Sequence, residues 1–175
     1  MKRLLLLRHA KASPDGKESK DFDRKLTARG RADSAAMGAW LHVNGYHPDH
    51  ILCSSAARTR ETWKIVSEEL GDGPKAEFAD LLYLASARRI EGLIREAADA
   101  AMLLVIGHNS GLEDCALELA RKPVGRDEAK QLETMREKFP TCTLAVLDFD
   151  IAEWSEMEAG GGALVEFVRP RDLKP

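Results

Sequence analysis

Three short apolar segments of this chain each end in residues that could bind or transfer an oxyanion. The segments and the residues that follow them are 4–7 with Arg8-His9, 51–53 with Ser54 and Arg58, and 102–106 with His108-Asn109. An arginine offers a fixed fork of N–H donors to an oxyanion. A histidine can act as a nucleophile, a ligand or an acid/base group near neutral pH. The repeated pattern therefore indicates phosphoryl chemistry.

The elements that must position these residues are strands. Each apolar segment is typical of a strand buried on both faces of a parallel sheet. If the strands are parallel, their carboxyl ends meet at one edge, where open α/β sheets bind ligands. Two histidines and two arginines would then surround one anion-sized space. Ser54 or Ser55 can cap the helix that follows the second strand, and the N-terminus of that helix would favour an anion.

Taken together, these residues resemble the histidine phosphatase superfamily, and within it the small phosphohistidine phosphatases of the SixA type. Arg8-His9-Ala10 is similar to the N-terminal signature of the family, and Gly107-His108-Asn109 to its second histidine motif. The segment from Ser54 to Thr62 is similar to the second arginine motif. Further similarity lies in residues 24–30, 139–141 and 167–173, so it extends over essentially the whole chain.

This resemblance implies a covalent mechanism without a metal or cofactor. His9 is expected to attack phosphorus through a neutral ring nitrogen, which gives a phosphohistidine that water then hydrolyses. Arg8, Arg58 and His108 are expected to bind the phosphoryl oxygens and to offset their charge in the transition state. Ser54 and Asn109 are expected among the substrate-binding residues.

The proton donor to the leaving group is less clearly marked in the sequence. Larger members of the superfamily carry a carboxylic acid after the third strand, and Asp80 is the candidate at that place. An exposed acid in a turn is the alternative interpretation of Asp80. A missing acid would favour a phosphohistidine substrate, because imidazole is a better leaving group near neutral pH than an alkoxide.

The rest of the chain alternates between predicted strands and helices. Thr27 can cap a helix that ends near Asn44-Gly45. Further helices are expected at 56–70, 85–100, 111–121 and 127–138, a short strand at 76–78, and two paired strands at 141–149 and 163–168, whose connecting loop could contain extended structure. The expected fold is α/β with three layers: a mostly parallel, doubly wound sheet with an antiparallel edge, as in phosphoglycerate mutase-like proteins.

Length and composition favour one soluble enzyme domain over residues 1–175. The chain is 44% hydrophobic and 31% charged, which is ordinary for a soluble globular protein. A net charge of −3 argues against general nucleic-acid binding. No apolar run approaches the roughly 20 residues that span a bilayer. Its three cysteines are unclustered, as in a reduced cytoplasmic protein, so we expect no membrane association and a cytoplasmic location.

Three functions remain open from the sequence. The first is removal of phosphate from phosphohistidine on a protein, such as a histidine phosphotransfer or phosphorelay component, as the resemblance implies. The second is a phosphatase or mutase for a small phosphorylated metabolite, which would need Asp80 or another carboxylate near the leaving oxygen. The third is a non-catalytic phosphate-binding module, which the presence of both His9 and His108 disfavours.

Overall fold

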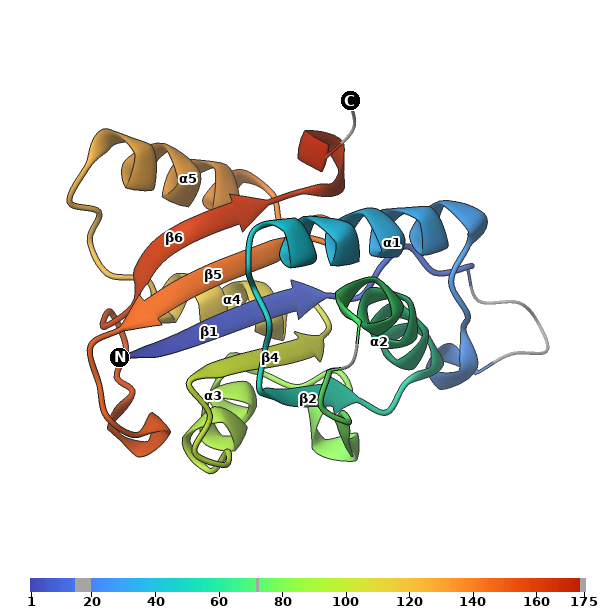
Figure 1. The fold of residues 1–175 in the computed structure, drawn as a ribbon, viewed down its shortest axis with the longest axis horizontal. Coiled ribbons are helices and arrows are strands. Elements are labelled where there is room, and N and C mark those ends of the chain that lie inside the picture. The colour runs from blue at the N-terminus through green and yellow to red at the C-terminus, as the bar shows by residue number, and fades with distance from the viewer. Residues whose placement is uncertain (15–19, 72, 174–175) are drawn as a thin grey trace.

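A six-stranded sheet runs through the centre of the molecule, in the order β3-β2-β4-β1-β5-β6 (Figure 1). The computed structural model describes residues 1–14, 20–71 and 73–173. Its strands are β1 (Lys2–Arg8), β2 (His50–Ser54), β3 (Glu77–Ala79), β4 (Met102–Gly107), β5 (Leu144–Phe149) and β6 (Ala163–Val168). Strands β3, β2, β4 and β1 are parallel, and β5 is antiparallel to both β1 and β6. The predicted mostly parallel sheet with antiparallel pairing at one end is confirmed.

The central strand β1 is buried because both of its faces are covered by helices. Successive side chains of a strand point to opposite faces of the sheet. Leu4 and Leu6 accordingly belong to one core cluster, and Leu5 and Leu7 to the other. All four leucines have no exposed surface. An uninterrupted leucine run is typical of a strand in this position, and β1 ends at Arg8, directly before His9.

Five helices form the two outer layers in the described part of the chain. They are α1 (Ala28–Val43), α2 (Ala57–Leu70), α3 (Ala87–Arg95), α4 (Gly111–Leu119) and α5 (Arg126–Glu137). Helices α1 and α2 cover the face of Leu5 and Leu7, whereas α3, α4 and α5 pack on the opposite face. In Figure 1, α1 and α2 lie in front of the sheet and α4 lies behind β1. None of these helices is long and apolar enough to cross a membrane.

The ends of α1 follow the local sequence signals. The Thr27 hydroxyl accepts a hydrogen bond of 3.0 Å from the Gly30 N–H, as expected for an N-cap. The helix ends before Asn44, and Gly45 then adopts φ +74°, a conformation that favours glycine. Both predicted ends of this helix are therefore confirmed.

One predicted helix cap and the predicted bounds of one helix are wrong. The residue that caps α2 is Ala56, and no side chain caps this helix, because the Ser54 hydroxyl lies against His108 instead. Helix α3 spans residues 87–95 rather than 85–100. The alanine-rich stretch after it leaves the helix because its carbonyls serve other elements: Ala100 accepts from the Trp154 indole and Ala101 from the backbone of Arg3.

Short 3-10 helices complete the fold. They are η1 (Asp21–Asp23), η2 (Asp80–Leu82), η3 (Trp154–Glu156) and η4 (Pro170–Leu173). The loop between β5 and β6 thus contains η3, and its extended structure is limited to one bridge between Gly162 and Ala120. Segments η1, η2 and η4 all lie in connections near the carboxyl ends of parallel strands, which places them around the candidate site.

Candidate active site

Three parallel strands deliver the predicted residues to the same edge of the sheet. Arg8 is the last residue of β1 and pairs with Gly107, the last residue of β4. The His9 N–H donates to the Gly107 carbonyl at 3.0 Å, so His9 and His108 leave the sheet side by side. Their ring centroids are 5.2 Å apart. The structure therefore brings the two histidines together, as expected from strand polarity.

His9 is held as a neutral ring with one defined tautomer. Its Nδ1 atom lies 2.7 Å from the Ala10 carbonyl, which can only accept, so Nδ1 carries the proton. Burial, against the opposing effect of this hydrogen bond and with a smaller contribution from the Arg58 and Arg8 guanidinium groups, lowers the pKa of His9 to about 4. At neutral pH the Nε2 atom consequently has a free lone pair, which is the state a nucleophile requires.

The loop that carries His9 is fixed against α2. The Ala10 N–H donates to the Thr62 hydroxyl at 3.0 Å, and that hydroxyl donates to the Arg58 carbonyl at 2.7 Å. One threonine thus links the segment that carries His9 to the helix turn that carries Arg58. The spacing from Arg58 to Thr62 is four residues, so both face the same side of α2.

His108 is oriented by Ser54. The Ser54 hydroxyl lies 2.7 Å from His108 Nε2. Both residues are buried, with an exposed fraction of 0% for Ser54 and 2% for His108. Burial lowers the pKa of His108 to about 3, and the neighbouring His9 and Arg58 add to this effect. The Nδ1 atom on the other side of the ring is buried and has no hydrogen-bond partner.

Arg58 is held by a residue that the sequence analysis missed. Its Nη1 donates to the Asp21 carbonyl at 2.7 Å, and its Nη2 donates to the Asp21 carboxylate at 3.1 Å. The Tyr83 hydroxyl donates to the same carboxylate oxygen. Hydrogen bonding from Tyr83 lowers the pKa of Asp21, while burial and the Asp21 carboxylate raise that of Tyr83. Asp21 is therefore ionised and Tyr83 protonated at neutral pH.

Tyr83 also contributes a wall to the site. Its ring lies edge-on to the His108 ring, with centroids 5.5 Å apart. The Arg58 guanidinium carbon lies 5.8 Å from the centre of the Tyr83 ring, within the range of a cation–π contact. The charged residues at 20–25 are visible in the sequence, but no local sequence pattern links Asp21 to Arg58 or Tyr83.

Arg8 and Asn109 share one backbone acceptor on the other side of the site. Arg8 Nη1 donates to the Phe139 carbonyl at 2.7 Å, and Asn109 Nδ2 donates to the same oxygen at 3.1 Å. The Asn109 amide also donates to Glu113 at 2.7 Å. Both amide hydrogens of Asn109 are thus engaged within the protein, and its role in substrate binding stays a prediction.

Three buried nitrogen atoms of these residues have no hydrogen-bond partner in the described part of the chain. They are Arg8 Nε, Arg58 Nε and His108 Nδ1. Each belongs to a side chain that is held through another of its nitrogen atoms: Arg8 by Phe139, Arg58 by Asp21 and His108 by Ser54. A buried polar group without a partner costs about 1–3 kcal/mol. An anion would satisfy such groups, and the positive charge of two arginines favours one.

Asp80 lies at the carboxyl end of β3, on the same edge of the sheet. It opens η2 and its side chain is exposed. Among the hydrogen bonds and ion pairs of the described residues, none joins its carboxylate to Arg8, His9, Arg58 or His108. The structure thus places Asp80 in the neighbourhood of the site, and its part in proton transfer stays a prediction.

Comparison with known proteins identifies the family. Residues 4–112, which contain all three strand-end motifs, match the family model described as histidine phosphatase superfamily (branch 1). The chain belongs to this superfamily. It is therefore a phosphatase by family, and its architecture is that of the phosphoglycerate mutase-like fold predicted from the motifs.

Similar proteins agree with the SixA-type branch of the superfamily. The uncharacterized protein Rv1276c of Mycobacterium tuberculosis is 36% identical over 167 residues, which cover 94% of this chain and all of that protein. The putative phosphohistidine phosphatase SixA from Agrobacterium tumefaciens is 29% identical, with a TM-score of 0.79 over 97% of this chain and 98% of that one. A putative SixA from Nakamurella multipartita is 28% identical, with a TM-score of 0.80 over 97% and 96% of the two chains.

Proposed function

We propose that this histidine phosphatase removes phosphate from phosphohistidine on a protein, through a covalent intermediate on His9 and without a metal. The observation that carries the proposal is the set of three unpartnered, buried donors on Arg8, Arg58 and His108 beside the neutral His9 ring. A phosphoryl group has three non-bridging oxygens that such donors could bind.

In the first step, His9 Nε2 attacks phosphorus and forms a new P–N bond. The P–N bond of the substrate breaks at the same time, and the substrate histidine leaves as imidazole after its ring has taken up a proton. The carbonyl of Ala10 holds the proton on Nδ1 and thereby directs the lone pair of Nε2 toward the incoming group. The low pKa of His9 keeps that lone pair available at neutral pH.

In the second step, water attacks phosphorus on phospho-His9 and releases inorganic phosphate, so that Nε2 regains its lone pair. In both steps the equatorial oxygens carry the charge that the donors must offset. If the Ser54 hydroxyl donates to His108 Nε2, the proton of the neutral ring resides on Nδ1, which then donates to the phosphoryl group. Ser54 would then bind substrate only through His108.

The leaving group supports a phosphohistidine substrate. A positioned general acid contributes about 10²- to 10⁴-fold to the reaction rate, and the departure of an alkoxide depends on such an acid. Imidazole is protonated near neutral pH, so its departure depends far less on a general acid. Asp80 is exposed, and no hydrogen bond or ion pair of the described residues joins its carboxylate to Arg8, Arg58 or His108, which fits a reaction that proceeds without a strong acid. The names of the two SixA-type structures point to the same substrate class.

The deciding experiment compares substrates in the presence of EDTA. We expect the purified protein to hydrolyse phosphohistidine peptides much faster than phosphoserine peptides of the same sequence or sugar phosphates. His9→Ala should fold normally and lose nearly all turnover, and a quench that avoids acid should trap phosphate on His9 of the parent. Full activity in His9→Ala would rule out the mechanism.

In the same assay, Asp80→Asn distinguishes a phosphohistidine phosphatase from a phosphatase for a small metabolite. With phosphohistidine peptides, kcat/KM should fall by less than about tenfold, well below the contribution of a positioned acid. A loss of 10²-fold or more, together with efficient hydrolysis of an alkyl phosphate, would instead support a phosphatase for a small metabolite.

A further inference from the structure

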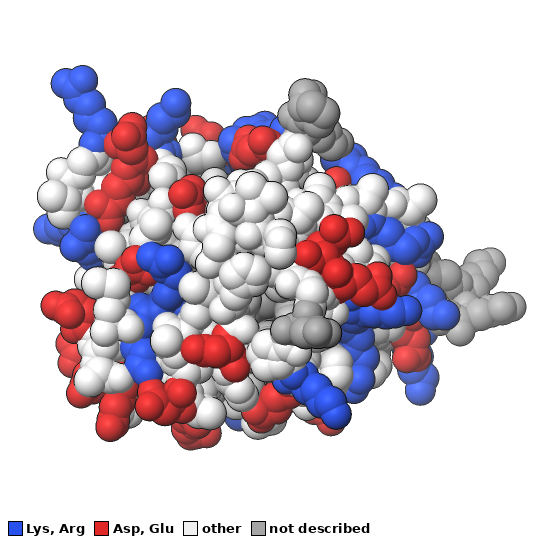
Figure 2. Space-filling view, viewed as in Figure 1, with Lys and Arg blue, Asp and Glu red and all other residues white. Residues whose placement is uncertain are grey.

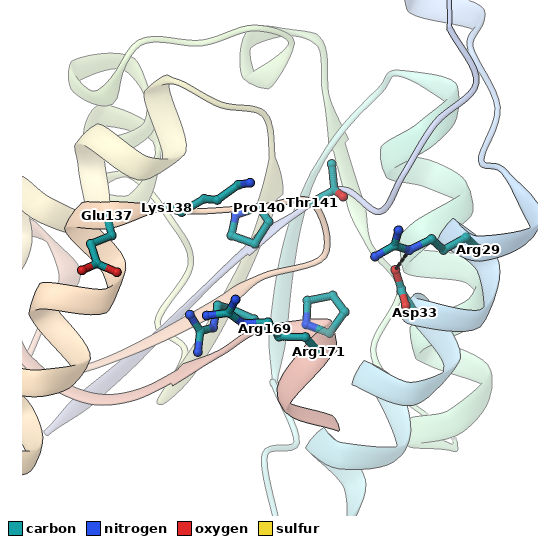
Figure 3. Close-up of a pocket in the computed structure, with 9 residues that line it drawn as sticks. Arg29, Asp33, Glu137, Lys138, Pro140, Thr141, Arg169 and Arg171 are labelled. Carbon is teal, nitrogen blue, oxygen red and sulfur yellow. Dashed lines mark ion pairs between the residues drawn. The ribbon is translucent and has the colours of Figure 1, made fainter. Parts of the chain in front are cut away.

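A second charged pocket lies at the same edge of the sheet as the catalytic residues. It is a pocket of about 440 Å³ between α1, the end of α5 and the segment after β6 (Figure 3). Four of its lining side chains are cationic and two are acidic: Arg29, Lys138, Arg169 and Arg171, with Asp33 and Glu137. Pro140 and Thr141 form the wall on the side of the α5–β5 connection. In the space-filling view, Lys and Arg at the side toward which the parallel strands point are interspersed with Asp and Glu (Figure 2).

The cationic side chains of this pocket are neutralised to different degrees. Arg29 pairs with Asp33 at 3.6 Å, and Arg169 forms a two-pronged contact with Asp172 at 2.9 and 3.0 Å. Arg171 is 3.9 Å from the same carboxylate and remains 72% exposed. Lys138 is exposed and forms no ion pair with another described residue. Lys138 and Arg171 are therefore the groups most available to an incoming anion.

The pocket adjoins the catalytic donors through a shared wall. Phe139, whose carbonyl holds Arg8, immediately precedes Pro140 and Thr141. The Cys142 N–H after them donates to the carbonyls of Arg8 and His9 at 3.1 and 3.0 Å. Strand β6, which delivers Arg169, runs parallel to β1 and lies two strands away from it in the sheet. Neighbouring strands are about 4.8 Å apart, so the backbone that leads to Arg169 lies on the order of 10 Å from the backbone that leads to His9 along this edge.

We propose that this pocket binds an acidic side chain of the substrate protein, close in sequence to the phosphorylated histidine. The inference rests on the proposed function, since it assumes a peptide whose phosphohistidine enters the catalytic site. An extended chain advances about 3.3 Å per residue, so a separation of about 10 Å corresponds to about three residues. The guanidinium group of Arg171 and the ammonium group of Lys138 would contact the carboxylate, and the Pro140 ring would contact its aliphatic stem.

The test uses synthetic phosphohistidine peptides that carry Glu, Gln or Lys three residues from the phosphohistidine, on either side. For the parent enzyme we expect a KM for the preferred Glu peptide that is about three- to tenfold below that of its Gln counterpart, the range for two partly exposed ion pairs. The double variant Lys138→Gln/Arg171→Gln should raise the KM of the Glu peptide to that of the Gln peptide. Its kcat should not change, because neither residue contacts the reacting group.

Lys122→Gln/Arg126→Gln is the matched control. It removes the same two charges from exposed positions at the opposite end of α5. We expect it to keep the preference for the Glu peptide, whereas an equal loss in both double variants would mean that overall charge, not the pocket, selects the peptide. Phosphoimidazole, which cannot reach the pocket, should be hydrolysed equally by the parent and both variants.

The two proposals fail in different ways. If the parent cleaves the Glu, Gln and Lys peptides with one KM, the pocket does not bind the acidic residue, while the phosphohistidine phosphatase activity stands. If no phosphohistidine peptide is cleaved but small phosphorylated metabolites are, the proposed function is wrong and the pocket proposal is overturned with it.

Discussion

At the scale of single residues, Asp21 determines how Arg58 is presented to an anion. Its carbonyl and carboxylate each accept from one terminal nitrogen of the guanidinium group, while Nε has no partner among the described residues. Tyr83 fixes the carboxylate from the other side. A charged donor fixed in advance is worth more in the transition state than a mobile one, because it needs no reorganisation.

Substitutions of Arg58 and of Asp21 should lower kcat by different amounts. Arg58→Lys should lower kcat by about 10²-fold or more, because an ammonium group lacks the planar fork. Asp21→Asn keeps the backbone contact and loses one charge-assisted hydrogen bond, so kcat should fall by about tenfold. Steady-state kinetics on a phosphohistidine peptide measure both effects.

Asp23→Asn is the control for this pair, since Asp23 is an exposed acid in the same 3-10 helix. It should retain the parent kcat. A parent-like kcat in Asp21→Asn would show that the carboxylate does not position Arg58, and a large drop in its melting temperature would assign the loss to stability instead.

At the scale of elements, the start of α1 is packed against the chain that leaves His9. The Thr27 N–H and hydroxyl both donate to the Lys11 carbonyl, at 2.8 and 3.1 Å. A Cβ on Gly30 would lie 2.1 Å from the same oxygen. Glycine is therefore required at this position for the helix to approach the active-site loop, whereas a Cβ on Gly92 in α3 would meet no atom within 4 Å.

This difference predicts opposite effects of the same substitution. Gly30→Ala should lower the free energy of unfolding by about 1–3 kcal/mol, as expected for overpacking against backbone. Gly92→Ala should raise it by up to about 1 kcal/mol, because alanine has the higher helix propensity. Urea denaturation of the two variants checks this, and equal effects would contradict the packing of α1 on Lys11.

At the scale of the whole molecule, the buried histidines couple the fold to pH. Burial lowers the pKa of His9 to about 4 and that of His108 to about 3, whereas in the unfolded chain both should titrate near 6.5. Between these values the unfolded state binds more protons than the folded state. Stability therefore rises with pH in this window and is lost as the pH falls from about 6.5 toward 4.

The corresponding measurement is the free energy of unfolding in urea at several pH values. The parent should lose stability on the order of a few kcal/mol between pH 6.5 and 4. His108→Gln should lose less over the same interval, since one buried titrating ring is gone. His47→Gln, which replaces an exposed histidine, should follow the parent. Identical slopes for the parent and His108→Gln would show that His108 does not remain neutral in the fold.

The sequence by itself determined the strand ends and therefore where the histidines and arginines of the candidate site emerge from the sheet. An uninterrupted run such as residues 4–7 is typical of a strand covered on both faces, and strand polarity then fixes the edge at which Arg8, His9 and His108 emerge. The cap of α1 by Thr27 was equally readable, because the signal lies within four residues.

Only the tertiary structure decided which groups hold those residues. Asp21 reaches Arg58 across 37 positions, Tyr83 reaches Asp21 across 62, and the Phe139 carbonyl reaches Arg8 across 131. Such contacts depend on how loops fold over the sheet edge, which local periodicity does not encode. Ser54 shows the same limit: its hydroxyl could cap a helix or orient a histidine, and the competition was settled by His108, which the fold places 2.7 Å away.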